Sequence, residues 1–150
     1  MFLDVWWDAS FGGIIGLLLG SFLNVVIYRL PKMMERQWAA ELAQMEATSQ
    51  GKDADELPHE AFNLMTPRSR CPSCGHVVQW YENVPVLSYL FLRGRCSACK
   101  TRISIRYPLV EIATGALFFF CIYRWGISPA GVAWCAFSAA LVALAFIDWD

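Results

Sequence analysis

Residues 11–28 read FGGIIGLLLGSFLNVVIY, an uninterrupted run without a single charged side chain. At a rise of about 1.5 Å per residue, a helix of this length nearly spans the roughly 30 Å hydrocarbon core of a bilayer. Residues 109–123 and 129–147 are also almost wholly apolar, and residues 109–123 are only just long enough to span the core. We therefore predict an α-helical integral membrane protein with about three transmembrane helices; buried helices of a soluble core are the alternative.

The composition agrees with a membrane protein. The 150 residues are 57% hydrophobic and 17% charged, whereas soluble domains have about 45–50% apolar and roughly 25% charged residues. The first apolar run is preceded by Asp4 and Asp8 and by no Lys or Arg, and no small-residue cleavage site follows it. A secretory signal peptide has a positively charged start, so we expect a retained membrane anchor.

The basic residues are concentrated in one loop. Eleven of the twelve Lys and Arg residues lie between Arg29 and Arg106, and eight of them crowd its two ends. By the positive-inside rule, residues 29–106 are cytoplasmic, the N-terminus is outside, and Asp148 returns to the cytoplasmic edge. Eight acidic residues are interspersed in the loop, which argues against a nucleic-acid surface.

Small residues recur every four positions in the first apolar run, at Gly12, Gly16 and Gly20, followed by Asn24. These positions share one helix face, so another helix can approach closely there. Asn24 either forms a hydrogen bond across that contact or lines a site.

The segments suggest the following division of the chain. We expect a first transmembrane helix over residues 1–30, a cytoplasmic loop over 31–107, and further transmembrane helices over 108–125 and 129–150. Pro31 should end or kink the first helix. Residues 32–47 then predict an amphipathic helix with an apolar stripe of Trp38, Leu42 and Met45, which lies either on the membrane surface or on the cysteine-containing part of the loop. Residues 48–59 predict a polar linker.

Two Cys-x-x-Cys pairs lie in the loop, Cys71-Pro72-Ser73-Cys74 and Cys96-Ser97-Ala98-Cys99, with 21 residues between them. This spacing is typical of two knuckles that close on one tetrahedral zinc, so we predict a zinc-ribbon-like module over about residues 62–107. Four thiolates make a closed, structural site. Disulfides are disfavoured in a reducing cytoplasm, but iron would use the same ligands.

The stretch between the cysteine pairs, residues 77–92, is rich in β-formers and turn residues, which favours short β-hairpins. Residues 87–92 are equally compatible with a helix. His76 is either a substitute metal ligand or a surface residue. Cys121 and Cys135 lie in the apolar helices, where we expect small buried hydrophobic side chains.

Ionisable groups at the ends of membrane helices are candidates for function. Asp148 and Asp150 close the third apolar segment, and Glu111 stands near the start of the second. Residues two apart on a helix point about 200° apart, so Asp148 and Asp150 do not form a pair on one face. Ordinary solvated helix-end acids remain the alternative.

Five ordered blocks resemble the type IV prepilin peptidases. The first is residues 20–31 (GSFLNVVIYRLP), and the paired Cys-x-x-Cys motif follows. The others are residues 82–90 (ENVPVLSYL), 106–111 (RYPLVE) and 146–150 (FIDWD). The insert at residues 32–36 (KMMER) is similar to the Gram-negative branch.

The resemblance implies a bifunctional, multi-pass enzyme of the bacterial inner membrane. Such an enzyme removes the leader of type IV prepilins and type II secretion pseudopilins, then methylates the new N-terminus with S-adenosylmethionine. It implies an aspartic peptidase whose first aspartate is Asp148, with Asp150 as the runner-up. The sequence does not locate the methyl-donor site, and it contains no glycine-rich dinucleotide turn.

The family's second aspartate belongs to a Gly-x-Gly-Asp block, which these 150 residues do not contain. We therefore expect an N-terminal fragment of a longer enzyme, inactive alone as a peptidase, because two carboxylates must share the proton transfers. The alternatives are a membrane-anchored zinc-ribbon adaptor and a rubredoxin-like metal protein.

Overall fold

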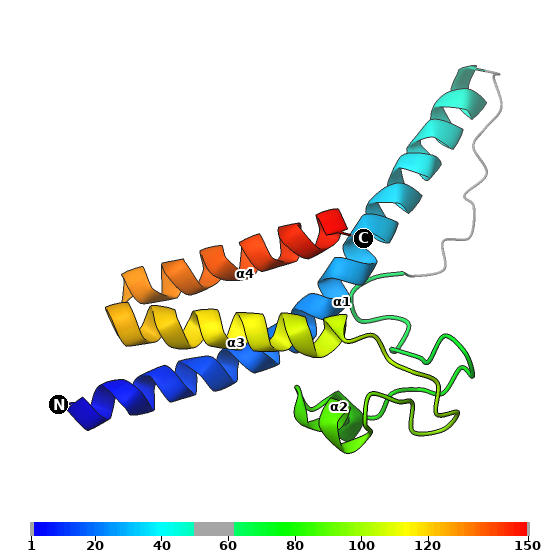
Figure 1. The fold of residues 1–150 in the computed structure, drawn as a ribbon. Helices are drawn as coiled ribbons and strands as arrows, with labels where there is room; N and C mark the ends of the chain where they lie inside the picture. The colour runs from blue at the N-terminus through cyan, green and yellow to red at the C-terminus, as the bar shows by residue number, and fades with distance from the viewer. Residues whose placement is uncertain (1, 50–61, 150) are drawn as a thin grey trace.

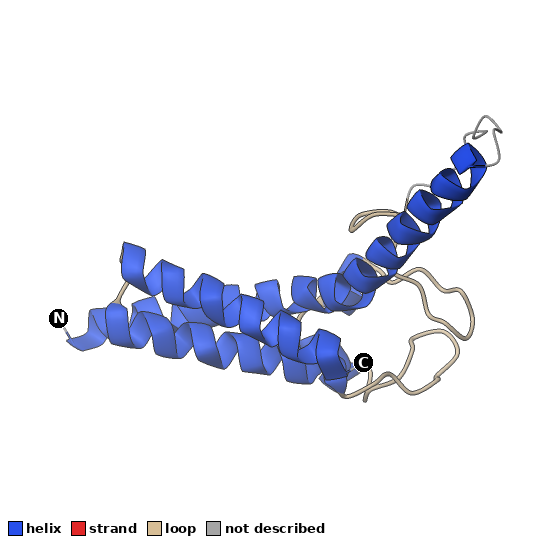
Figure 2. Cartoon of the chain, turned by 90° about the horizontal axis from the view of Figure 1, so that it is seen from above, coloured by secondary structure: helices blue, strands red, loops and turns tan. Residues whose placement is uncertain are grey.

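The computed structural model describes residues 2–49 and 62–149. Its elements are α1 (Phe2–Ser49), the 3-10 helix η1 (Trp80–Asn83), α2 (Leu87–Phe91), α3 (Arg106–Trp125) and α4 (Pro129–Trp149). Helices α1, α3 and α4 are long and apolar enough to cross a membrane. They lie alongside one another and run alternately up and down, with residues 62–105 gathered at one end (Figures 1 and 2).

The bundle leaves much apolar surface uncovered. Along α4, Phe137, Leu141 and Leu144 are each at least half exposed. A soluble monomer rarely presents a continuous apolar surface of this kind, whereas lipid covers it without cost. The architecture therefore fits an integral membrane protein, as the three apolar segments predicted.

α1 continues through Pro31 as a single helix. The prediction that Pro31 ends the helix is wrong, because a proline costs one backbone hydrogen bond and the flanking residues keep the helical path. The axis of α1 changes direction about its middle (Figure 1), as the alternative of a kink predicted. The predicted linker, residues 48–59, lies almost entirely outside the described residues.

The apolar stripe predicted for residues 32–47 of α1 is not covered by the part of the chain that the structure describes. Trp38, Leu42 and Met45, the predicted apolar stripe, are 57%, 62% and 66% exposed. Packing on the cysteine-containing part of the loop was one of the two predicted arrangements, and the described residues contradict it. The other arrangement, on a membrane surface, stays a prediction.

The glycines of α1 form its contact with α3, as predicted. A Cβ atom on Gly16 would lie 2.7 Å from Cβ of Phe118 and 2.8 Å from the carbonyl oxygen of Thr114. One turn on, a Cβ on Gly20 would lie 2.7 Å from Cα of Glu111. No other residue type fits these positions without moving the helices apart, so the stripe sets the distance between α1 and α3.

Asn24 closes this contact with a hydrogen bond. Its side-chain amide nitrogen donates to the backbone carbonyl of Tyr107 over 3.0 Å, and the residue is 5% exposed. The packing role is therefore confirmed. Cys121 and Cys135 are buried in the α3–α4 contact beside Phe118 and Ile122, which confirms them as small core residues.

The predicted β-hairpins between the cysteine pairs are wrong. Residues 80–83 form η1 and residues 87–91 form α2, so the helical alternative for residues 87–92 is confirmed. The physical reason is that side chains take the backbone groups a hairpin would need. Glu82 accepts the N–H of Gln79 over 2.8 Å, and Glu111 of α3 accepts the N–H of Val86 over 2.7 Å.

Two polar side chains of the bundle fasten the loop to it. Arg29, only 7% exposed, donates to the carbonyl oxygens of Asn63 and Pro67. Its guanidinium also lies over the ring of Phe62. At the far side of the loop, the Glu111–Val86 hydrogen bond holds the start of α2 against α3. The loop is thus attached to the bundle before the first cysteine pair and again between the two pairs.

Candidate metal centre

The first cysteine pair lies in a tight backbone turn. The N–H of Cys71 donates to the carbonyl of His76, and the N–H of Gly75 donates back to the carbonyl of Cys71, both over 2.9 Å. A single β-bridge between Arg70 and Val77 closes the base of the turn. Gly75 has φ +72°, a conformation that costs glycine nothing.

The second pair repeats the same turn. The N–H of Cys96 donates to the carbonyl of Thr101 over 2.9 Å, and the N–H of Lys100 donates to the carbonyl of Cys96 over 3.1 Å. A β-bridge joins Arg95 to Arg102. Lys100 occupies the position of Gly75 with φ +60°, at a steric cost that glycine would avoid. The two pairs therefore form equivalent knuckles. Each knuckle is closed by one isolated β-bridge in place of the paired strands of a zinc ribbon.

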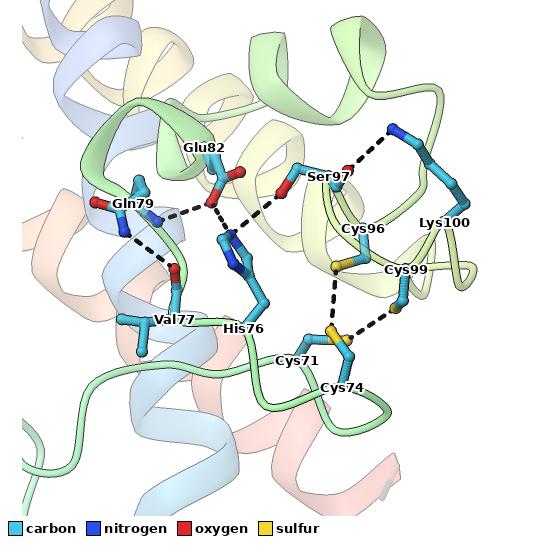
Figure 3. Close-up of polar contacts among 10 residues, drawn as sticks. All are labelled: Cys71, Cys74, His76, Val77, Gln79, Glu82, Cys96, Ser97, Cys99 and Lys100. Atoms are coloured by element: carbon cyan, nitrogen blue, oxygen red, sulfur yellow. Dashed lines mark hydrogen bonds and ion pairs between the residues drawn. The ribbon is translucent and has the colours of Figure 1, made fainter.

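The two knuckles bring four sulfur atoms together (Figure 3). Cys71 Sγ lies 3.7 Å from Cys99 Sγ, Cys74 Sγ lies 4.0 Å from Cys96 Sγ, and all four lie within 4.8 Å of one another. A tetrahedron with Zn–S bonds of about 2.3 Å has sulfur–sulfur edges of about 3.8 Å. The four thiols are free rather than disulfide-bonded. Their spacing fits one tetrahedral metal ion.

The protonation of these thiols is uneven. The hydroxyl and the N–H of Thr101 stabilise the Cys99 thiolate and lower its pKa to about 6. The N–H of His76 acts in the same direction on Cys74, but the neighbouring sulfurs of Cys99, Cys71 and Cys96, together with desolvation, raise the pKa of Cys74 to about 11. Four adjacent thiols cannot all ionise unless a cation lies among them. A metal ion supplies that charge, and its binding releases the remaining protons.

A polar network links the knuckles beside the sulfurs. His76 Nε2 lies 3.2 Å from Glu82 Oε2 and 3.2 Å from Ser97 Oγ. Figure 3 shows the imidazole of His76 directed toward Glu82 and Ser97 and not toward the sulfur atoms. His76 is therefore not a substitute ligand in this arrangement. Sequence reasoning missed its link to Glu82 and Ser97, because no local pattern indicates a contact across 21 residues.

Hydrogen bonds to Glu82 favour its charged form. The N–H of Gln79 is the largest contributor, followed by Ser97 and His76, and together they hold the pKa of Glu82 below its ordinary value of 4.5. The same carboxylate of Glu82 therefore accepts the N–H of Gln79 at the start of η1 and contacts the imidazole of His76. The second knuckle is thus tied to the first without using a sulfur atom.

The carboxylates predicted as catalytic are separate from the cysteines in the chain. Asp148 lies in the last turn of α4 and is exposed; Asp150 lies outside the described residues. The C-terminal end of α4 is at the same end of the bundle as the cysteine knuckles (Figure 1). Asp148 therefore stands at the bundle edge that also carries the loop, while Asp8 stands at the opposite edge.

The fold and the site together define a helical protein of the membrane-spanning type with a four-thiol knuckle module at one end. The chain belongs to the family described as the bacterial peptidase A24 N-terminal domain, whose model matches residues 14–125. This confirms the resemblance to the N-terminal part of the prepilin peptidases.

Curated relatives support the same assignment. A prepilin leader peptidase/N-methyltransferase of Burkholderia pseudomallei (strain 1026b) is 51% identical over 139 residues, which is 93% of this chain and 44% of that protein. Proteins of the same name from Pseudomonas putida and Neisseria gonorrhoeae are 50% and 46% identical, each over 91% of this chain and 46% of their own length. This chain therefore spans about half the length of these relatives. No solved structure gave a significant match.

Proposed function

We propose that this chain forms the N-terminal half of a bifunctional inner-membrane enzyme that cleaves the leader from type IV prepilins and type II secretion pseudopilins and then methylates the new N-terminus. The observation that carries the proposal is the identity of about one half to relatives named prepilin leader peptidase/N-methyltransferase. Their match extends over more than nine tenths of this chain. In the proposed topology residues 29–106 are cytoplasmic, and the three apolar helices cross the lipid bilayer.

In the proposed mechanism, Asp148 is one of two carboxylates at the cytoplasmic edge. One aspartate takes a proton from the attacking water while the other donates a proton to the carbonyl oxygen of the scissile peptide. These 150 residues contain no Gly-x-Gly-Asp block, so we propose that the second aspartate comes from elsewhere in the enzyme and that this chain alone does not cleave prepilin. Asp150 is the alternative for the first aspartate.

We further propose that Cys71, Cys74, Cys96 and Cys99 bind one structural zinc ion. The sulfur spacing and the absence of a fifth ligand among the described residues support a closed site. When bound, zinc would hold the two knuckles together in a ribbon-like module and supply no catalytic water. S-adenosylmethionine is the proposed methyl donor, because the relatives are named as N-methyltransferases; we assign no residue to it.

The test is an Asp148→Ala substitution in the full-length protein, with Asp8→Ala as the matched control at the opposite end of the bundle. We expect Asp148→Ala to abolish prepilin cleavage while methylation of a pilin peptide that already carries a free N-terminus persists. Asp8→Ala should retain both activities. Normal cleavage by Asp148→Ala would move the catalytic role to Asp150 or, if Asp150→Ala is also active, favour a zinc-ribbon adaptor over an enzyme.

A further inference from the structure

The short helix α2 presents an apolar stripe that nothing in the described part of the chain covers. Leu87, Leu90 and Phe91 are 54%, 64% and 85% exposed. Positions i, i+3 and i+4 lie on one face of a helix, so the three side chains form a continuous patch. Exposed apolar patches of this kind mark interaction surfaces.

α2 is attached to α3, one of the three helices that are long and apolar enough to cross a membrane. The N–H of Val86, which immediately precedes α2, donates to Glu111 Oε2 over 2.7 Å. Glu111 is the sixth residue of α3, so this hydrogen bond stands about 7 to 8 Å along α3 from its first residue. The start of α2 is therefore held beside the first turns of α3. Figure 1 shows α2 beside the end of the bundle and not at the tip of the loop.

A basic pocket adjoins the apolar stripe. Its volume is about 360 Å³, and it is lined by Phe91, Leu92, Arg93, Arg95 and Lys100. Phe91 therefore belongs to both the stripe and the pocket. The Lys100 ammonium also donates to the carbonyl of Ser97 over 3.0 Å, which directs it along the knuckle.

The charge around this pocket is almost entirely positive. Residues 62–105 contain six Lys and Arg residues and a single acidic residue, Glu82. Glu82 is already engaged by His76 and by the N–H of Gln79. Within this segment the structure pairs neither Arg93 nor Arg95 with a carboxylate. The pocket therefore suits an anion supplied from outside the module.

We propose that α2 and this pocket form a binding site for anionic glycerophospholipid. Leu87, Leu90 and Phe91 enter the acyl-chain boundary, where their burial is favourable, as for other interfacial helices. The guanidinium groups of Arg93 and Arg95 bind the lipid phosphate at headgroup level, because arginine matches phosphate oxygens with paired N–H donors. The site anchors the metal module to the membrane beside the first turns of α3.

The experiment places the photoreactive residue p-benzoylphenylalanine at position 91 of the full-length protein. The protein is reconstituted in nanodiscs of phosphatidylcholine containing a minority of phosphatidylglycerol, irradiated and examined by mass spectrometry. We expect lipid adducts at position 91, with phosphatidylglycerol enriched over its share of the bilayer. Adducts to protein alone, or none, would overturn the proposal and indicate a polypeptide or water over this face.

Two pairs of substitutions of equal charge test the pocket. Arg93→Gln with Arg95→Gln should reduce the enrichment of phosphatidylglycerol by about fivefold for each cation removed. Arg68→Gln with Arg70→Gln removes the same charge outside the pocket and should leave most of the enrichment. Both variants must retain their bound metal, which shows that the module is folded. If both pairs of substitutions reduced the phosphatidylglycerol enrichment equally, net charge alone would explain the enrichment. That result would contradict a specific site.

Discussion

The bundle and the module formed by residues 62–105 are stabilised in different ways. In the bundle, the backbones of α1 and α3 approach so closely that Gly16 has no room for a Cβ atom, and Ile27, Val110 and Thr114 are almost fully buried. In the module, the only buried residues are Pro85, Gly94 and Cys96. The module therefore has no hydrophobic core of its own, and segments this small usually depend on a metal or disulfides.

The two regions also encode their structures differently in the sequence. The bundle is specified by small residues that recur every four positions along α1, and each of them contributes a small part of the contact with α3. The module is specified by a few backbone turns, four sulfurs and the link from His76 to Glu82 and Ser97. Removing one element of the bundle should weaken it, whereas removing one ligand from the module should unfold it.

The largest effect is expected from the metal ligands. Cys96→Ser should abolish stoichiometric metal binding and unfold the module, because metal binding by small thiol sites contributes on the order of 10 kcal/mol to folding. Hydrogen exchange should show lost protection at the N–H groups of Cys71 and Ile103, which are hydrogen-bonded in the module. The amides of α3 should keep theirs. Cys135→Ser, in the bundle, is the matched control and should leave the metal content unchanged.

A substitution at the glycine stripe should break the bundle and spare the module. Gly16→Ile places a side chain where Phe118 and Thr114 already lie within 3 Å, so we expect a loss of roughly 1–3 kcal/mol or more. Thermal unfolding in detergent measures it. Ser10→Ile adds the same side chain to an exposed position of α1 and should change little. Equal destabilisation by both substitutions would show that the stripe does not set the helix contact.

Removing the charge of Glu82 should loosen the module without unfolding it. Glu82→Gln should accelerate metal loss to a chelator several-fold at pH 7, because the link to His76 and to the N–H of Gln79 is weakened. The folded-state pKa of Glu82 is lowered from 4.5. Its stabilising contribution is therefore complete above about pH 4.5 and is lost as the pH falls through the lowered pKa. Identical dissociation rates for wild type and variant at pH 7 would contradict this role.

The smallest effect is expected at Asn24. Asn24→Leu removes the hydrogen bond to the carbonyl of Tyr107 but also removes a buried amide oxygen that has no partner among the described residues. Hydrogen bonds between membrane helices contribute about 0.6 kcal/mol on average, so the change in unfolding free energy should be near zero. A loss of several kcal/mol would show that Asn24 does more than join α1 to α3.

The sequence predicted the features that repeat or that lie close together in the chain. Apolar runs predicted three helices, glycine spacing predicted the α1–α3 contact, and two Cys-x-x-Cys motifs predicted that four cysteines converge. It failed where a distant residue decides local structure. Residues 77–92 contain strand-forming side chains, but Glu111, 25 positions beyond Val86, takes the N–H that a strand would use. Pro31 was also misleading, because helix propensity on both sides continues α1 through it.

The proposed zinc ion, with its four sulfur ligands, holds the module together. The direct test is to measure the metal content of the purified full-length protein and its X-ray absorption at the zinc edge. We expect one zinc per chain with four sulfur neighbours at about 2.3 Å. Stoichiometric iron in place of zinc would support a rubredoxin-like centre. Fewer than four sulfur neighbours, or a folded module without any metal, would contradict the claim.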